Sequence, residues 1–347
     1  MILIIGAGLS GLLTGYRLKQ AGIPFKILEA RNRIGGRINT IYKLNNAPIE
    51  MGATWFTHQH QNLIALLHEL EIGYFKQFMN NTAFYQSSPT SSANIIQIPH
   101  QSPSYRVSDG TSYLINTLYE KLDKNDVLLN QSVKEIKIHH NTVQIIANEV
   151  FEGTKVVLAI PPKLWSKKII FTPNLPSDLL RIAKQTHTWM EDSIKVALNY
   201  EHPFWEHENL PSTLFSNSGP ITELYDHCNH EKSKYALCGF INSSNNNLSI
   251  VKRRANIIEQ LKPFFGKKVE QFTTYTDCVW SQEEHTFEPS EDFLFPHQNN
   301  GNPIFSNRLF DGKLLISNSE TALKFPGYMD GAVYSGNAAA QKIINNL

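Results

Sequence analysis

Apolar residues near the N-terminus form first a continuous run and then a helical pattern. The run Ile2–Ile5 is continuously apolar, which is typical of a strand buried on both faces. Residues 12–20 place their apolar side chains on one face of a helix, and this pattern ends before Gly22. A second strand is predicted over 24–29. The order strand, helix, strand predicts an α/β fold with a parallel sheet.

Further periodic segments follow along the chain. Helices are predicted over about 61–71, 110–122 and 330–344, and strands over 127–129, 133–138, 143–147, 155–159 and 313–316. The stretch from Asn80 to Ser104 is rich in Ser, Asn, Gln and Pro, and is interpreted as an insertion with loops. Pro161 and Pro162 interrupt the chain, and residues from about 163 to 294 are predicted to form a second body.

The composition and net charge add few constraints to the predicted fold. The net charge of the 347 residues is +1, which argues against nucleic acid or an acidic membrane surface as a partner. No apolar run reaches the length of about 18 residues that a membrane helix needs. The three cysteines Cys228, Cys238 and Cys278 form no CxxC pair, and are interpreted as reduced thiols of a cytoplasmic protein. A disulfide between Cys228 and Cys238 is the alternative.

A glycine motif lies between the first strand and the first helix. Gly6, Gly8 and Gly11 have the spacing that permits a tight turn and the close approach of a pyrophosphate to the N-terminus of a helix. This spacing alone is a weak signal, because a chance glycine turn has the same letters. Glu29, at the end of the second strand, strengthens it, since a carboxylate there accepts hydrogen bonds from ribose hydroxyls.

A second motif follows directly, with Arg31 and then Gly35, Gly36 and Arg37. A nicotinamide site does not require Gly-Gly-Arg just after the ribose carboxylate. A cofactor of longer reach does, because backbone and guanidinium can both meet its pyrophosphate. The alternative is a loop that merely contains basic residues.

With these motifs in place, the chain resembles the flavin-containing amine oxidases, a superfamily of monoamine, polyamine and L-amino acid oxidases. The resemblance covers the whole chain and is that of a short, soluble, bacterial-type member. Nine stretches match in order: IIGAGLSGL, ILEARNRIGGRI, IEMGATWF, SDGTSYLINTL, SVKEI, VVLAIPPKLW, SIKVALNYEHPFW, CVWSQEEHTF and ISNSETALKFPGYMDGAVYSG.

The resemblance implies a Rossmann-like FAD fold of the two-dinucleotide-binding-domain kind, with an inserted α+β substrate domain that contains a mixed sheet. The FAD-binding domain is expected to comprise residues 1–75, 105–162 and 295–347. The substrate-binding domain is expected to comprise residues 76–104 and 163–294.

The resemblance also implies which residues bind FAD. Gly52 and Ala53 would leave room for the flavin ring, and the backbone of Val133 would meet the adenine. Glu320 would lie at the ribityl chain, and the helix that opens at Met329 would point its N-terminus at the flavin. The expected set is Gly6, Gly8, Ser10, Gly11, Glu29, Ala30, Arg31, Gly35, Gly36, Arg37, Gly52, Ala53, Thr54, Val133, Glu320, Tyr328 and Met329.

Lys195 is the leading candidate for catalysis. It lies in a strand-like run of mostly apolar residues, where burial of an ammonium is costly without a partner. An edge-strand lysine that faces solvent is the alternative from the pattern alone. In the family the lysine of this motif holds a water against the flavin. The resemblance further gives Tyr328 a catalytic role as one wall of an amine cage, and assigns Trp55 to the substrate cavity.

Two positions depart from the family pattern. An ungapped count from Trp280 puts Pro289 where many monoamine oxidases have the cysteine that attaches FAD, so FAD is expected to be non-covalent. The same count puts Ser290 where the second aromatic wall stands. The amine cage is therefore expected to have one wall, Tyr328, and an open side at Ser290.

The resemblance implies oxidation of a small amine to an imine, with O2 as acceptor and H2O2 as product. The alternatives are another flavin oxidoreductase of this fold, namely a renalase-like NAD(P)H oxidase, an L-amino acid oxidase or a desaturase, and finally a flavin-free binding protein. None of the thirteen histidines has the spacing of a metal site, and no metal is expected. Neither nucleic acid nor a membrane is expected as a partner, and the oligomeric state is left open.

Overall fold

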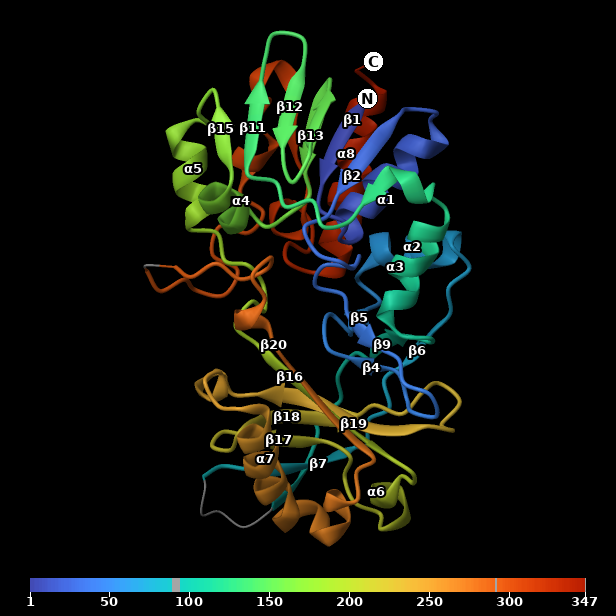
Figure 1. The fold of residues 1–347 in the computed structure, drawn as a ribbon. Helices are drawn as coiled ribbons and strands as arrows, with labels where there is room; N and C mark the ends of the chain where they lie inside the picture. Colours follow the sequence, from blue (N-terminus) through green and yellow to red (C-terminus); the bar gives the residue numbers. More distant parts are fainter. Residues whose placement is uncertain (89–93, 291, 347) are drawn as a thin grey trace.

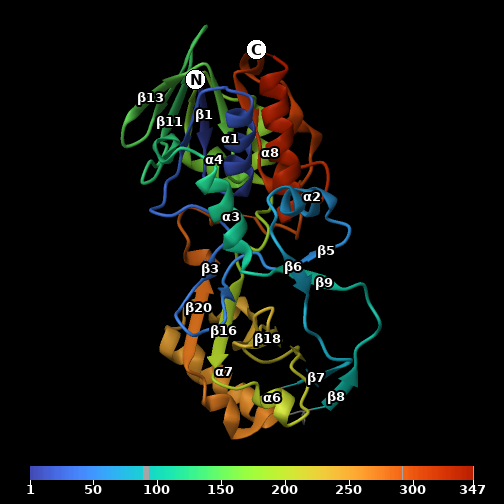
Figure 2. The same cartoon turned by 90° about the vertical axis from the view of Figure 1, so that its right-hand side faces the viewer.

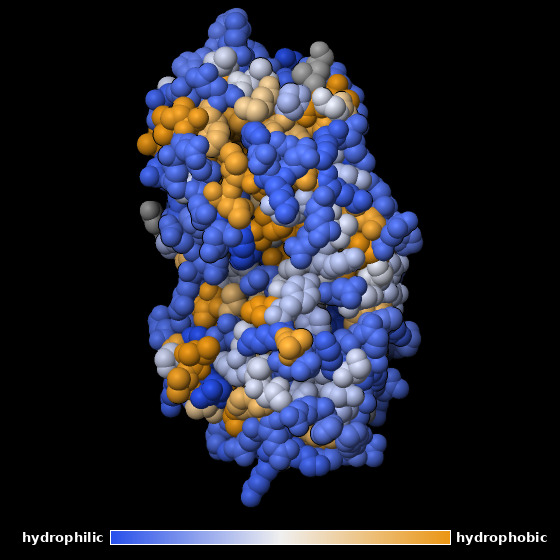
Figure 3. All heavy atoms as spheres, turned by 45° about the vertical axis from the view of Figure 1, so that its right-hand side comes forward, coloured by the Kyte–Doolittle hydropathy of each residue, from blue (hydrophilic) through white to orange (hydrophobic). Residues whose placement is uncertain are grey.

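The computed structural model covers residues 1–347 and describes all of them except 89–93, 291 and 347. The molecule has two halves joined by a narrower middle (Figure 1). Both chain ends lie in the upper half, and the lower half is built around a separate sheet. The space-filling view shows a mostly hydrophilic surface on which apolar residues gather in small, separate groups (Figure 3).

A five-stranded parallel sheet forms the centre of the upper half, with strand order β10-β2-β1-β14-β21. The strands are β1 (Ile2–Ile5), β2 (Phe25–Leu28), β10 (Val127–Leu128), β14 (Lys155–Leu158) and β21 (Leu314–Ile316). Because side chains alternate along a strand, Ile2 and Ile4 face one hydrophobic core while Leu3 and Ile5 face another. The predicted parallel sheet and its first strands are therefore confirmed.

Helices cover the face of this sheet on which Ile2 and Ile4 lie. They are α1 (Leu9–Gln20), α2 (Gln61–Glu69), α3 (Thr111–Glu120) and α8 (Met329–Ile344). α1 and α8 run side by side in both ribbon views, and the Thr14 hydroxyl donates to the Gly336 carbonyl at 3.3 Å (Figures 1 and 2). This packing brings the N-termini of two helices to the lower edge of the sheet.

A second layer covers the opposite face, where Leu3 and Ile5 lie. Its four-stranded sheet comprises β11 (Glu135–Ile138), β12 (Val143–Ile146), β13 (Val150–Gly153) and β15 (Ile170–Thr172). The helices α4 (Pro162–Lys168) and α5 (Ser177–Lys184) pack into the same core. The expectation that residues 163–294 form the second body is corrected here. Trp165, Phe171 and Leu179 are buried against the upper sheet, so the crossing to the lower half comes after α5.

The lower half contains a seven-stranded sheet in the order β20-β16-β19-β18-β17-β7-β8. The strands are β7 (Thr82–Gln86), β8 (Asn94–Gln97), β16 (Ile194–Tyr200), β17 (Leu214–Ser216), β18 (Ile221–Asp226), β19 (Tyr235–Ile241) and β20 (Thr274–Val279). β17 and β7 are parallel while the other pairs are antiparallel, so the predicted mixed sheet is confirmed. The insertion expected over 80–104 contains the two strands β7 and β8, which the sequence did not predict, and residues 89–93 lie outside the described part.

The two faces of this lower sheet have different neighbours. α7 (Ile250–Phe265) packs on one face, against a core that includes Ile194, Val196 and Leu198. Lys195 and Ala197 alternate with these residues and face the upper half, as strand geometry requires. The sheet thus presents a row of side chains toward the upper half.

The remaining elements are short. The strands are β3 (Thr40–Ile41), β4 (Ile49–Glu50), β5 (Phe56–Thr57), β6 (Tyr74–Lys76) and β9 (Ser104–Val107), and the helix is α6 (Phe204–His207). Single 3-10 turns are η1 (Lys124–Asp126), η2 (Ser243–Asn245), η3 (Gly266–Glu270), η4 (Trp280–Gln282), η5 (Pro303–Ser306), η6 (Phe310–Gly312) and η7 (Ser319–Thr321). Among the described residues, no helix combines the length and apolar character needed to cross a bilayer.

Candidate active site and cofactor cavity

One cavity of about 760 Å³ runs between the two halves. It extends from Glu29, at the end of β2, to Lys195, on the lower sheet. Most residues expected at the site line it: Gly6, Gly8, Ser10, Glu29, Ala30, Arg31, Gly35, Gly36, Arg37, Gly52, Ala53, Thr54, Trp55, Val133, Lys195, Tyr328 and Met329. Three of the expected residues do not line it: Gly11, Glu320 and Ser290.

The glycine turn after β1 forms one wall of the cavity. A Cβ atom on Gly11 would lie 2.0 Å from the Gly6 carbonyl oxygen, so Gly11 permits α1 to pack on β1 rather than touching a ligand. A Cβ atom on Gly8 would meet no atom within 4 Å, because Gly8 opens onto the cavity. The turn therefore has room for a phosphate group against the N-terminus of α1.

The Glu29 carboxylate lies beside this turn and is 4% exposed. It accepts hydrogen bonds from the backbone N–H groups of Ala7 at 2.8 Å and Arg31 at 2.9 Å. These contacts hold the carboxylate in the cavity wall with acceptor sites to spare. The arrangement fits the ribose of a nucleotide, as the sequence predicts.

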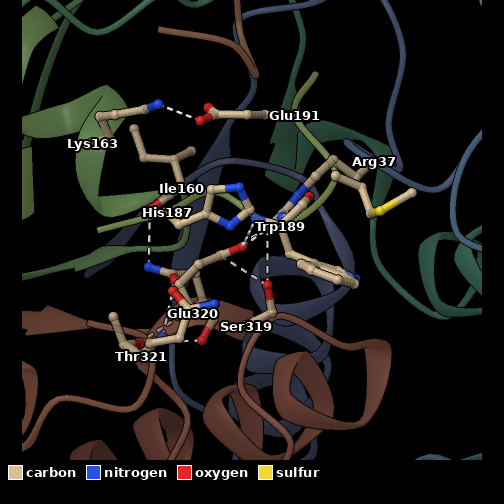
Figure 4. A network of polar contacts seen from close by, with 12 residues as sticks. Arg37, Ile160, Lys163, His187, Trp189, Glu191, Ser319, Glu320 and Thr321 are labelled. Atoms are coloured by element: carbon tan, nitrogen blue, oxygen red, sulfur yellow. Dashed lines mark hydrogen bonds and ion pairs between the residues drawn. The ribbon is translucent and has the colours of Figure 1, made fainter. Parts of the chain in front are cut away.

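Arg37 reaches the cavity from the second motif, and Glu320 lies behind it (Figure 4). Its guanidinium donates to the two Glu320 carboxylate oxygens at 2.5 and 2.8 Å and to Ser319 Oγ at 2.9 Å. Burial alone would raise the pKa of Glu320, but the Arg37 charge together with the hydrogen bonds from Arg37 and Ser319 outweighs burial and lowers it. Glu320, at 0% exposed, thus orients Arg37 and does not itself line the cavity.

The middle of the cavity is bordered by the segment Gly52–Thr54. A Cβ atom on Gly52 would lie 2.0 Å from the Arg37 carbonyl oxygen, so only glycine fits there. The Trp280 indole N–H donates to the Met51 carbonyl at 2.7 Å and fixes the same segment from below. Gly52, Ala53 and Thr54 therefore border the middle of the cavity with small side chains, which leave room for a cofactor ring.

Lys195 closes the lower end of the cavity and is 2% exposed. Its ammonium donates to the Gly52 carbonyl at 2.8 Å and to the Thr54 hydroxyl, and lies 4.7 Å from the ring centre of Trp55 and 5.3 Å from that of Phe240. Burial lowers the pKa of Lys195. The lysine is therefore buried on the inner face of the sheet, and the solvent-facing alternative is wrong.

Tyr328 caps α8 and lines the cavity, but the open side expected at Ser290 is not found. Ser290 is exposed and does not reach the cavity, so the ungapped count does not give the opposite wall. Trp189 lines the cavity instead, with its ring centre 5.8 Å from that of Tyr328. His297 stacks on Trp189 at 3.9 Å and supports it from behind.

Several cavity residues carry no local sequence signal. Trp189 belongs to the irregular segment between α5 and β16, while His285 and Thr286 follow η4. Glu223 and Phe240 lie on β18 and β19 and are paired with each other, and Phe240 is paired with Lys195. Because cross-strand partners face the same side of a sheet, these three residues form one row. The sequence could have found this row only if the strand register had been known.

Within the described residues, no cluster of His, Cys, Asp and Glu side chains could hold a metal ion. The cavity instead combines a carboxylate suited to ribose, an open glycine turn, a fixed guanidinium and a middle part lined by small residues. These features define a dinucleotide-dependent oxidoreductase whose cofactor is long enough to reach from Glu29 to Lys195. FAD fits this description.

Comparison with known proteins gives the family. The family model described as flavin containing amine oxidoreductase matches residues 9–93 and 85–344. The chain belongs to this family, and it is an FAD-dependent oxidoreductase that acts on amines. The alternative of a flavin-free binding protein is therefore wrong.

Two curated relatives align along nearly the whole chain. The probable flavin-containing monoamine oxidase A of Dictyostelium discoideum is 21% identical over 453 aligned positions, which cover 100% of this chain and 98% of that protein. Putrescine oxidase of Kocuria rosea is 21% identical over 460 positions, which cover 99% and 95%.

Solved structures confirm the fold. Wild-type putrescine oxidase bound to putrescine superimposes with a TM-score of 0.84 at 23% identity, over 99% of this chain and 98% of that chain. Cyclohexylamine oxidase from Brevibacterium oxydans superimposes with a TM-score of 0.86 at 17% identity, over 99% and 98%.

Proposed function

We propose that this protein oxidises an alkyl amine that carries a second positive charge, such as a diamine, with O2 as electron acceptor. The observation that carries the proposal is the row Lys195, Phe240 and Glu223 on the lower sheet. Two strand spacings separate Lys195 from Glu223, a distance of about 10 Å between their backbones. The similarity to putrescine oxidase supports the same substrate class.

Glu223 has the properties of a cation-binding group. Its carboxylate lines the cavity and accepts a hydrogen bond from the Tyr225 hydroxyl at 2.8 Å. Within the part of the chain that the structure describes, no lysine, arginine or histidine forms an ion pair with it. Asp192 lines the same cavity and adds a second negative charge. The lower end of the cavity is therefore suited to an ammonium group.

The aromatic residues near the row strengthen this preference. The faces of Trp55 and Phe240 border the space between Lys195 and Glu223 and would stabilise a cation. Arginine is found in this cavity at Arg31 and Arg37, which both belong to the cofactor end. Among the described residues, Arg106 interacts electrostatically with Lys195 but does not line the cavity, so the proposal favours an amine over an amino acid.

The roles of the protein groups follow from these contacts. When bound, FAD accepts a hydride equivalent from the carbon next to the amine nitrogen and passes both electrons to O2, while the resulting imine is hydrolysed. Lys195 has two N–H groups engaged by Gly52 and Thr54, and its third N–H is available to order a water at the closed end. Tyr328 and Trp189 border the substrate, and Glu223 fixes its distal ammonium.

Two measurements test the proposal. Purified protein should release H2O2 with butane-1,4-diamine and release far less with butylamine, which lacks the distal charge. The proposal also includes non-covalent FAD, since none of the three cysteines, Cys228, Cys238 and Cys278, lines the cavity. Acid precipitation should then leave the yellow colour in the supernatant, whereas a yellow pellet would contradict this part.

A further inference from the structure

The segment Glu283–Pro289 forms the cavity wall at the end where Glu29 lies. His285 and Thr286 line the cavity together with Val133 and Ile169, which belong to the upper half. Thr286 is 2% exposed although it lies in a segment outside any helix or strand. A loop residue is buried to this degree only when other elements hold it in place.

Arg31 holds this segment from the side of β2. Its guanidinium donates to Thr286 Oγ1 at 2.7 Å, to the Glu283 carboxylate at 3.3 Å and to the His285 carbonyl at 3.4 Å. The backbone N–H of Arg31 donates to Glu29 at the same time. One residue therefore connects the segment to the carboxylate expected to bind the ribose.

α4 holds the segment from the opposite side. Lys168 donates to the Glu284 carbonyl at 2.7 Å and lies 3.5 Å from the Glu288 carboxylate. Lys167 donates to the Pro289 carbonyl at 2.5 Å, and the Lys163 ammonium lies 5.7 Å from the ring centre of Phe287. Cations from two separate elements thus converge on one short loop.

We propose that Glu283–Pro289 is a clamp that retains the nucleotide half of FAD, with His285 and Thr286 in contact with the cofactor. The clamp is fastened mainly by charged side chains at its edges, and such contacts open at lower cost than a hydrophobic core. The segment can therefore swing away to admit FAD and close over it afterwards. This role concerns cofactor retention and does not depend on which amine is oxidised.

The test measures how fast FAD leaves the protein. Lys168→Met removes two of the contacts from α4, and Thr286→Val removes the shortest of the hydrogen bonds from the Arg31 guanidinium while keeping the side-chain shape. Lys184→Met is the matched control, because Lys184 is an exposed lysine on the neighbouring helix α5, outside the clamp. Release is followed as the rise in flavin fluorescence after dilution into buffer without FAD or amine.

Each clamp variant should release FAD about tenfold faster than wild type, since each loses a charge-assisted hydrogen bond. The control should match wild type. Raising the salt concentration should speed release in wild type more than in Lys168→Met, because screening weakens the contact that this variant lacks. Lys168 is exposed, so its replacement leaves the fold intact even if Thr286→Val does not.

Wild-type release rates in both clamp variants would overturn the proposal and make the segment an ordinary loop. A loss of amine turnover with unchanged FAD release would also overturn it, since the segment would then serve the substrate. Failure of the diamine proposal would leave these rates unaffected, so the two tests are independent.

Discussion

The two ends of the cavity are built in different ways. At the upper end, Glu29 and the turn at Gly8 present mostly backbone groups and one carboxylate whose position is fixed by backbone N–H groups. At the lower end, Lys195, Phe240 and Glu223 present side chains from three neighbouring strands of one sheet. Backbone groups are little affected by side-chain substitutions, so the upper end suits a fixed cofactor. At the lower end, a single substitution can alter which substrate binds.

This contrast predicts where substitutions act. Changes at the upper end should weaken FAD binding and stability together, because turn, helix and carboxylate form one packed unit. Changes at the lower end should alter the choice of substrate or the rate while FAD stays bound.

Glu320→Gln should have the largest effect, at the upper end. The substitution leaves the Arg37 guanidinium with a weaker partner in a buried place, at a cost of about 3 kcal/mol in the free energy of unfolding. Thermal unfolding of the FAD-loaded protein should therefore begin at a lower temperature, with weaker FAD binding. Glu223→Gln is the matched control, because it makes the same carboxylate-to-amide change at the other end of the cavity and should leave FAD binding unchanged.

The same ion pair gives a pH dependence. Arg37 lowers the pKa of Glu320 below its ordinary value of 4.5. The ion pair therefore stabilises the fold fully above pH 4.5, and this stabilisation is lost as the pH falls through the lowered pKa of Glu320. Wild type should lose stability over this range more steeply than Glu320→Gln. Parallel curves for the two proteins would show that the pair does not stabilise the fold.

Lys195→Met should reduce turnover by about a hundredfold, in line with the loss of one well-placed polar group. FAD should stay bound, because the upper end is untouched. Stopped-flow measurement of flavin reduction by amine, and separately of its reoxidation by O2, shows which step is affected. Wild-type rates in both steps would make Lys195 a structural residue.

Glu223→Gln should change substrate preference rather than general activity. The ratio of kcat/KM for butane-1,4-diamine to that for butylamine should fall by about thirtyfold, because the distal ammonium loses its charged partner. Butylamine itself should react as before. An unchanged ratio would remove Glu223 from the substrate site.

Trp189→Leu should have the smallest effect, about tenfold in kcat/KM, through loss of one aromatic wall beside Tyr328. Ser290→Tyr is the matched comparison and should leave all amines unaffected, since Ser290 is exposed and away from the cavity. If Ser290→Tyr altered the preference for small amines while Trp189→Leu did not, the second wall of the substrate site would be formed at Ser290 and not at Trp189.

The sequence predicts the upper end well because its signals are local. Gly6, Gly8 and Glu29 belong to one strand–helix–strand unit, whose spacing and chemistry follow from short-range geometry. The pairing of Arg37 with Glu320 could not be predicted in the same way, since 283 residues separate them. The sequence places Glu320 near the cofactor but does not reveal that it acts through Arg37.

The lower end shows the limit of sequence reasoning more clearly. Lys195 is identified by its motif, but its neighbour Glu223 becomes visible only with the register of β16, β19 and β18. Trp189 lies in an irregular segment, where no periodicity predicts the direction of a side chain. The ungapped count from Trp280 gave the wrong position for Ser290, because it assumed that the loop after Trp280 has the same length and course as in the family.

Anaerobic titration of the FAD-loaded protein with butane-1,4-diamine tests directly whether the protein oxidises a diamine. The yellow flavin absorbance should be lost on addition of the diamine and should return when O2 is admitted, with one H2O2 formed per flavin. Flavin that stays oxidised in the presence of this diamine, of butylamine and of longer polyamines would contradict it.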